Sequence, residues 1–463
     1  MKPLKLVFLI FLSLIFLTSM TYSTDLGIKK KTLKNGLEIL VIENHSVPLM
    51  TVEICVKNGA FTEPLEYSGL SHLYEHMFFK ANEKLPNQEA FLERTRELGM
   101  IWNGTTGNER VNYFFTCPSI NLKEAAEFMR DATMYPLFDQ AELERERPVV
   151  IGEYDRNEAN PPYHLFVAFA KKMWGNYYNR KNALGERSTI LAATKEQMQT
   201  IQKKFYVPNN SALLIAGDVK AEEVFKLAED MFGKWEKAEE PFIKNPPVTF
   251  KPIEKPEAVI VEKQFPVPIV LIGFHGPDTK RDIPGTHAAD VFSYILNQKT
   301  SNFYKALVES GLMLGVNFGY QTEHNVGPIM VYFQCQQEKL KDAIKGLGAE
   351  IEKFDDPTYF TDAQLETAKN RLAVDEIYGR ESTSNWVHTV SYWWASAGLD
   401  YYAKYINDLK KVTRADINKY VNKYIKGKNY IVGALVSEDM VKSLDLKESD
   451  LLLGTSESEK TGK

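Results

Sequence analysis

Two histidines and a glutamate stand close together in the segment His72-Leu73-Tyr74-Glu75-His76. Residues four apart on an α-helix share a face, so His72 and His76 can direct two imidazoles at one point. Imidazole binds zinc at roughly 2.0–2.1 Å, and a catalytic zinc takes three protein ligands and leaves one position open for water. Glu75 borders the same face and can take a proton from that water. The pattern predicts zinc-assisted hydrolysis, although chance can also produce this spacing.

The third zinc ligand must come from elsewhere in the chain. One acidic run supplies five candidates: Glu142, Glu144, Glu146, Glu153 and Asp155. The same pattern is equally typical of a solvated helix face. Pro148 interrupts the run, and a proline kinks or splits a helix unless it lies in the first turn, as in a helix that starts near Arg147. The residues alone leave the choice of carboxylate open.

Strands and helices of mixed order surround these residues and predict an α+β fold. Apolar and polar residues alternate along 50–57, which predicts a half-buried strand paired with another at 37–43. Further strands are expected at 101–106 and 111–117. Helices are expected at 68–80, 87–98, 122–134 and 140–158.

An internal repeat divides the chain into two related halves. The frame of Thr194, Met198, Ile201 and Phe205 recurs 219 residues later, and a second echo joins 138–149 to 360–371. Five prolines between positions 241 and 256 predict a stiff connector. We therefore expect two homologous domains, each a mainly antiparallel sheet packed with helices. The expected segments are a zinc-binding domain at 28–235, a linker at 236–256, a second domain at 257–445 and a disordered tail at 446–463.

The second half does not repeat the zinc ligands. Its stretch corresponding to 72–76 keeps one histidine, His287, and has Asp290 where the glutamate would stand. Ala368 and Asp375 take the places of Glu146 and Glu153. We expect this half to bind no metal, and His287 to be a surface or capped histidine.

The amino terminus has the pattern of a secretory signal. Lys2 and Lys5 precede an apolar run at 6–17, and small residues lead to an expected cut after Ser23. The run is shorter than the roughly 20 residues that a spanning helix needs, which disfavours the alternative of an uncleaved anchor. We expect a signal at 1–23 and an exported protein, periplasmic or secreted, with no membrane span after cleavage.

Charge and cysteine content bear on nucleic-acid binding and on disulfide formation. The formal net charge is −5 and no long basic block is present, which argues against nucleic acid as a partner. Cys55, Cys117 and Cys335 each lie in a strand-like apolar run. An odd count without a metal-binding spacing indicates core residues with at most one disulfide.

The segment around the histidine pair resembles the pitrilysin and insulinase family of zinc metallopeptidases, in the branch of bacterial enzymes and mitochondrial processing peptidases. The resemblance runs from about Ile28 to Met440. It rests on the order His-x-x-Glu-His with its flanks, on the stretch that ends at Glu153, and on two further motifs. These are Asn103-Gly104-Thr105-Thr106, and Phe205-Tyr206 followed by Pro208-Asn209-Asn210.

The resemblance implies a role for several residues. His72, His76 and Glu153 would bind one zinc ion per chain, and Glu75 would activate the zinc-bound water. Glu146 would lie behind the ligands and orient one of them. Asn103 and the strand after it would hold the backbone of a peptide substrate as an added strand, although asparagine at such a position is also typical of a turn.

The resemblance also implies a partner. In this family the second domain often supplies an arginine and a tyrosine that grip the substrate near the zinc. Val308 and Leu314 stand at those places here, and neither can bind a carbonyl oxygen. We therefore expect a heterodimer with a homologous subunit that supplies both residues. The expected function is a zinc endopeptidase acting on peptides or unfolded segments, and the alternative is a non-catalytic scaffold or peptide-binding subunit.

Overall fold

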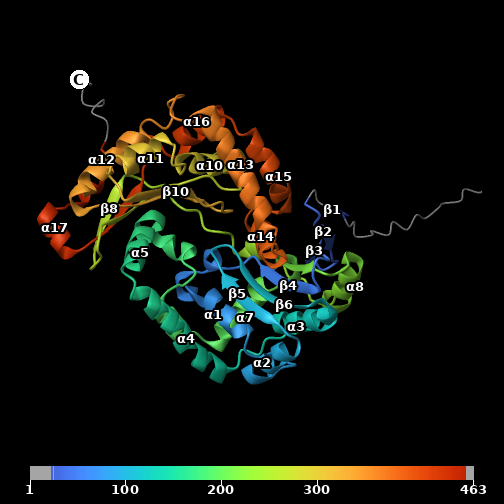
Figure 1. The fold of residues 1–463 in the computed structure, drawn as a ribbon. Helices are drawn as coiled ribbons and strands as arrows, with labels where there is room; N and C mark the ends of the chain where they lie inside the picture. The colour runs from blue at the N-terminus through green and yellow to red at the C-terminus, as the bar shows by residue number, and fades with distance from the viewer. Residues whose placement is uncertain (1–21, 24–25, 455–463) are drawn as a thin grey trace, which may run out of the picture.

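A computed structural model describes residues 22–23 and 26–454 of the chain (Figure 1). The strands of the first half are β1 (Tyr22–Ser23), β2 (Lys29–Thr32), β3 (Glu38–Glu43), β4 (Leu49–Val56), β5 (Ile101–Thr106), β6 (Val111–Pro118) and β7 (Ser211–Gly217). Its helices are η1 (Ala60–Thr62), η2 (Leu65–Tyr67), α1 (Leu70–Phe78), α2 (Gln88–Glu97), η3 (Ser119–Asn121), α3 (Leu122–Met134), α4 (Gln140–Glu158), α5 (Pro161–Trp174), η4 (Gly175–Lys181), α6 (Arg187–Leu191), α7 (Lys195–Phe205), η5 (Pro208–Asn210) and α8 (Ala221–Phe232).

The second half repeats this plan after the short helix α9 (Pro241–Lys244). Its strands are β8 (Glu257–Glu262), β9 (Ile269–His275), β10 (Gly315–Tyr320), β11 (Pro328–Gln334) and β12 (Ile431–Val436). Its helices are α10 (Ile283–Leu296), α11 (Asn302–Tyr304), η6 (Lys305–Glu309), η7 (Gln337–Lys339), α12 (Leu340–Ile351), α13 (Asp362–Gly379), α14 (Thr383–Ser396), α15 (Leu399–Lys411), α16 (Arg414–Tyr424), α17 (Glu438–Leu444) and η8 (Glu448–Leu451).

The strands form two separate sheets. The first has the order β1-β2-β3-β7-β4-β6-β5, and the second has the order β10-β11-β9-β12-β8. Within the described chain, only the pairs β3–β7 and β8–β12 are parallel. The predicted α+β class with two mainly antiparallel sheets is confirmed. The repeat is visible in detail, because Thr194 and Thr413 cap α7 and α16 with the same capping box.

The strand pairing near the amino terminus differs from the prediction. β3 and β4 are not neighbours, because β7 lies between them, parallel to β3 and antiparallel to β4. More than 150 residues separate β4 from β7, and alternation along one strand carries no information about such a distant partner.

One helix of each half packs on the sheet of the other half (Figure 1). Leu165 and Phe169 of α5 share a core with Leu271 of β9 and Leu435 of β12. In return, α14 covers β4 and β7. The strand β4 is therefore buried on both faces apart from its first residue, and the expectation of a half-buried strand is wrong. The two halves share one continuous core as a result.

The ends of the predicted segments also need correction. Of the tail expected to be disordered at 446–463, the described residues 446–454 instead pack on the second half: Leu446 and Leu451 are buried, and η8 forms. The connector 236–256 carries α9, and its Phe250 is buried. The predicted signal lies outside the described residues except for Tyr22–Ser23, which pair with β2.

Two further expectations concern cysteines and membranes. Cys55, Cys117 and Cys335 are all buried free thiols. Among residues 22–23 and 26–454, no helix has the length and apolar character needed to cross a bilayer.

The close packing of α5 on the second sheet gives a stability prediction. A Cβ added to Gly433 of β12 would lie 2.8 Å from Leu165 Cδ1, so an alanine there must displace the buried Leu165 side chain of α5. We expect Gly433→Ala to lower the free energy of unfolding by about 1–3 kcal/mol, the usual effect of overpacking a core. Urea denaturation measures it.

Gly379→Ala is the matched control, because a Cβ at this last residue of α13 meets nothing within 4 Å. It should be neutral or slightly stabilising, since alanine is the better helix former. Equal effects of the two substitutions would contradict the described packing of α5.

Candidate metal centre

The helix α1 is fixed at its start by a buried carboxylate. Gly69 precedes the helix in the left-handed region, at φ +89°, and a Cβ there would lie 2.7 Å from Leu184 O. Glu63 accepts hydrogen bonds from the backbone N–H groups of Gly69 at 2.7 Å and Ser71 at 2.6 Å. A carboxylate at this position satisfies free N–H groups and complements the helix dipole. Burial nevertheless raises the pKa of Glu63 to about 7.

The opposite face of α1 anchors it in the first core. Leu73, Tyr74, Met77 and Phe78 are buried, and the Tyr74 ring stacks on Tyr206 with 4.1 Å between centroids. With its apolar face buried, the helix turns His72 and His76 toward α4. Packing therefore fixes the rotation of α1 about its axis.

His72, His76 and Glu153 converge. The Nε2 atoms of the two histidines lie 3.3 Å apart. Glu153 Oε2 lies 3.5 Å from His72 Nε2 and 3.7 Å from His76 Nε2. They are the one group of three or more His, Cys, Asp or Glu side chains in the described chain whose ligand atoms all lie within 4.8 Å of one another.

This triangle of donor atoms fits a zinc ion. Tetrahedral ligands at the usual zinc distances are separated by about 3.3–3.5 Å, close to the three separations found here. Two nitrogens and one carboxylate oxygen form a donor set typical of a catalytic zinc, which keeps one position open. Burial, with the neighbouring His76, lowers the pKa of His72 to about 4, so its imidazole is neutral and able to bind metal near pH 7.

Glu146 lies behind His76 and fixes its ring. His76 Nδ1 lies 2.8 Å from Glu146 Oε1, and the buried Lys80 ammonium lies 2.6 Å from Glu146 Oε2. If Nδ1 carries the proton and donates it to this carboxylate, Nε2 is left with its lone pair toward the metal position. Burial opposes the charge on Glu146, but its bonds to His76 and Lys80 outweigh that effect and lower its pKa. The buried His72 Nδ1 has no hydrogen-bond partner in the described chain.

Both Glu146 and Glu153 reach the centre because α4 runs unbroken through Pro148. Of the two alternatives for this proline, neither a split helix nor a start near Arg147 is found. Of the five acidic candidates, Glu153 faces the two Nε2 atoms, whereas Glu146 contacts the other ring nitrogen of His76, Nδ1.

Glu75 is almost buried between α1 and β5. It is 9% exposed, and burial raises its pKa, which suits a group that must accept and return a proton. Thr106 Oγ1 donates a hydrogen bond of 2.6 Å to Glu75 Oε2. A Cβ on Gly104 would lie 2.8 Å from Glu75 Cγ, so only glycine leaves room for this side chain.

The contacts of Gly104 and Thr106 with Glu75 were not predicted from the sequence. Both residues lie inside the Asn103–Thr106 motif, but only the packing of β5 against α1 shows what they touch. Asn103 itself is exposed on β5, the edge strand of the first sheet, and its Oδ1 accepts from the N–H of Gly104 at 2.9 Å. The outer edge of β5 is open to an added strand.

The corresponding place in the second half is closed. His287 of α10 is 5% exposed and stacks on Tyr401 of α15, so the expectation of a surface or capped histidine is wrong. Asp290 accepts a hydrogen bond of 2.8 Å from Tyr405 Oη, and burial raises its pKa to about 7. Tyrosines of α15 therefore cover the position where a ligand would approach.

The contact between Glu146 and His76 predicts an effect on metal affinity. Glu146→Gln leaves Lys80 without its buried counter-charge and weakens the restraint on the His76 ring. We expect zinc affinity to fall by about 10–100-fold, the usual cost of losing such a partner. Competition with a chromogenic chelator measures it.

Glu142→Gln is the matched control for that experiment. Glu142 is a buried carboxylate one turn earlier on α4, paired with Arg145 at 2.6 Å and outside the histidine cluster. Its replacement should leave zinc affinity within about twofold of the parent. An equal loss in both variants would mean that Glu146 has no specific part in the metal site.

Known proteins resemble this chain over most of its length. Residues 38–185 match the family model described as Insulinase (Peptidase family M16), and residues 192–372 match Peptidase M16 inactive domain. An uncharacterized zinc protease of Rickettsia felis is 23% identical, over 76% of this chain and 84% of that protein. Zinc protease PqqE of Helicobacter pylori is 23% identical, over 85% of this chain and 89% of that protein.

A probable mitochondrial-processing peptidase subunit beta of Arabidopsis thaliana is 22% identical, over 87% of this chain and 77% of that protein. A solved protease from Helicobacter pylori superposes with a TM-score of 0.78 at 22% identity, covering 88% of this chain and 99% of that one. The periplasmic protease PqqL from Escherichia coli gives a TM-score of 0.76 at 16% identity, covering 93% of this chain and 50% of that one. With family models matched along both halves, the chain belongs to the pitrilysin and insulinase family of peptidases.

Proposed function

We propose that this protein is a zinc-dependent endopeptidase with one zinc ion per chain. The observation that carries the proposal is the convergence of His72, His76 and Glu153 beside the nearly buried Glu75. A zinc that only stabilises the fold is normally closed by four protein ligands and needs no such base. Three ligands with a base beside them favour hydrolysis.

Each residue has a distinct part in the proposed reaction. Bound at the three donor atoms, zinc would polarise the scissile carbonyl and make water more acidic. Glu75 would accept the proton of the attacking water and return it to the leaving amine. Thr106 would hold the Glu75 carboxylate toward the reacting atoms, and Glu146 would keep His76 oriented.

Peptides or unfolded polypeptide segments are the substrates that fit this site. An extended peptide can add to the free edge of β5, where backbone hydrogen bonds bind it with little regard to sequence. Asn103 would contact the substrate backbone at this edge. Because β5 also contacts Glu75, such a peptide would lie beside the proposed base.

A homologous partner subunit is the second part of the proposal. Val308 packs against the second core and Leu314 is 52% exposed, and neither offers a polar side chain to a substrate. Two comparisons support pairing: the Arabidopsis relative is named a subunit, and the match covers only 50% of the PqqL chain. We propose a heterodimer whose other member supplies an arginine and a tyrosine.

Export is the proposed location. The lysines and apolar run at the amino terminus support a cleaved signal, and the solved PqqL is named a periplasmic protease. The three free thiols are buried, so they would be shielded from oxidation in either compartment.

A non-catalytic scaffold or peptide-binding subunit is the second candidate function. The loss of polar residues at Val308 and Leu314, and the name of the matched inactive domain, favour it. The presence of both the base and all three ligand side chains favours the enzyme.

Replacing the base separates these functions. Glu75→Gln keeps the shape of the side chain but cannot accept a proton, so we expect peptide cleavage to fall by about 100–10,000-fold while zinc stays at one per chain. Fluorogenic peptide assays and metal analysis measure both. A chelator should abolish wild-type cleavage and added zinc should restore it. Wild-type protein that binds zinc but cleaves nothing, with or without a partner, would favour the scaffold.

The partner can be tested by mixing. The chain alone should cleave peptides slowly, and a homologous subunit carrying the arginine and tyrosine should raise kcat by about 100-fold or more, because such donors stabilise transition-state charge. A partner with both residues changed to alanine is the control. Full activity of the single chain, unaffected by any partner, would contradict the heterodimer.

A further inference from the structure

Glu323 of the second half contacts two separate segments of the first half. It lies in the loop 321–326 between β10 and β11, hereafter the bridging loop, and is 1% exposed. Asn108 Nδ2 donates a hydrogen bond of 2.8 Å to Glu323 Oε1. Glu323 Oε2 forms an ion pair with Lys181 Nζ, and both side chains are almost fully buried. One carboxylate thus joins the turn between β5 and β6 to the end of η4.

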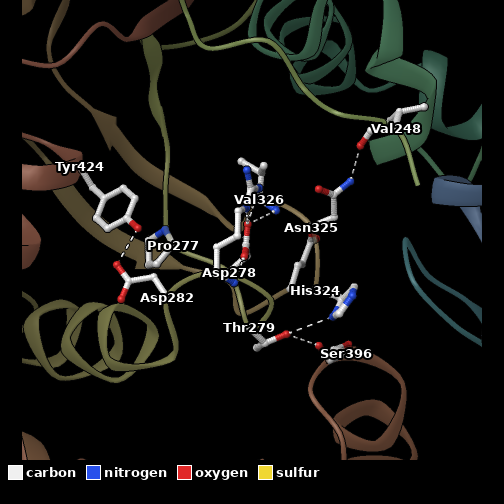
Figure 2. Close-up of polar contacts among 12 residues, drawn as sticks. Val248, Pro277, Asp278, Thr279, Asp282, His324, Asn325, Val326, Ser396 and Tyr424 are labelled. Carbon is white, nitrogen blue, oxygen red and sulfur yellow. Dashed lines mark hydrogen bonds and ion pairs between the residues drawn. The ribbon is translucent and has the colours of Figure 1, made fainter. Parts of the chain in front are cut away.

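The bridging loop is held firmly by the second half and by the connector 236–256 (Figure 2). The N–H of Val326 donates to Asp278 Oδ2 at 3.1 Å, and Asn325 Nδ2 donates to Val248 O at 2.8 Å. Val326 has φ +55°, a left-handed conformation that is strained for a β-branched residue. Such a residue persists only where its surroundings determine the backbone, as they do here.

The first contact of Glu323 leads to the proposed base. The next residue after Asn108 supports the same junction, because the Glu109 carboxylate accepts from the N–H groups of His324 at 2.7 Å and Asn325 at 3.0 Å. This turn lies two residues beyond Thr106, whose hydroxyl bonds Glu75. The second half therefore fixes the end of the strand that positions Glu75.

The second contact leads to the helix that carries the histidines. Lys181 also donates to Asn325 O at 2.8 Å and Val326 O at 3.0 Å. Two residues earlier, Asn179 Nδ2 donates 2.7 Å to Glu63 O, and the Glu63 carboxylate holds the first turn of α1. The backbone of η4 thus links the bridging loop to the start of α1.

We propose that Glu323 is a positioning residue for the metal site: through Asn108 it fixes the strand beside Glu75, and through Lys181 it fixes the start of α1. The second half, which lacks metal ligands of its own at the corresponding place, would thereby help to position the metal site of the first half. The effect on cleavage rests on the proposed function. The effect on metal geometry needs only that His72, His76 and Glu153 bind a metal ion, and the effect on the β5–β6 hairpin needs neither.

Glu323→Gln tests the proposal, because it keeps the size of the side chain and removes the negative charge of the ion pair with Lys181. Backbone amides at 101–112 should exchange with deuterium about tenfold faster, as expected for the loss of a charged hydrogen bond. The visible spectrum of the cobalt-substituted protein should shift, since it reports ligand geometry. With an active partner complex, kcat should fall by about 10–100-fold.

Glu350→Gln is the matched control. Glu350 is a buried carboxylate of the second half, bonded to Tyr359 Oη and Lys353 Nζ, each at 2.7 Å, away from the first half. Asn108→Ala separates the two contacts and guards against misfolding of Glu323→Gln. It should speed exchange at 101–112 and lower kcat while leaving the cobalt spectrum unchanged.

Hairpin exchange and a cobalt spectrum in Glu323→Gln equal to those of Glu350→Gln would overturn the proposal. If no form of the protein cleaves peptides, the proposed function fails, but exchange and the cobalt spectrum still decide whether Glu323 positions the site.

Discussion

Three donor atoms, one each from His72, His76 and Glu153, are held within 4 Å of one another by two helices. Donor atoms that converge in this way stay in place only if the surrounding packing is rigid. Rigid packing is supplied by the buried apolar face of α1, the carboxylate of Glu63 at its start and the unbroken course of α4. The rest of the fold can be understood as support for these two helices.

The reciprocal packing of α5 and α14 is the main source of that support. α5 leaves the end of α4 and crosses to the second sheet, so the helix carrying Glu153 is tied to the second half. α14 crosses the other way and closes the far face of β4 and β7, placing the Glu53–His388 pair inside the junction. Neither sheet would be covered on both faces without the other half, and interiors packed in this way move little.

The two halves differ at corresponding places: side chains fill the place in the second half, and the place in the first half is accessible. In the second half Tyr401 and Tyr405 of α15 lie over His287 and Asp290. Their aromatic rings fill the space that a metal ion and a substrate would need. The counterpart region of the first half keeps Glu153 one-third exposed and β5 free at the sheet edge. The same architecture thus carries the candidate metal centre in one half and only packing at the corresponding place in the other.

The sequence by itself determined those features of the protein that depend on local spacing along the chain. Four-residue spacing placed His72 and His76 on one helix face, and the repeat predicted two related halves. The resemblance also pointed to Glu153 among the acidic residues, and the structure brings its carboxylate to the histidines. Only the tertiary structure decided that β7 separates β3 from β4 and that Gly104 and Thr106 touch Glu75. It also decided that residues 446–454 pack as part of the second half. Helix periodicity is a property of local backbone geometry, whereas strand order and burial of both faces depend on contacts between residues hundreds of positions apart, which no local pattern encodes.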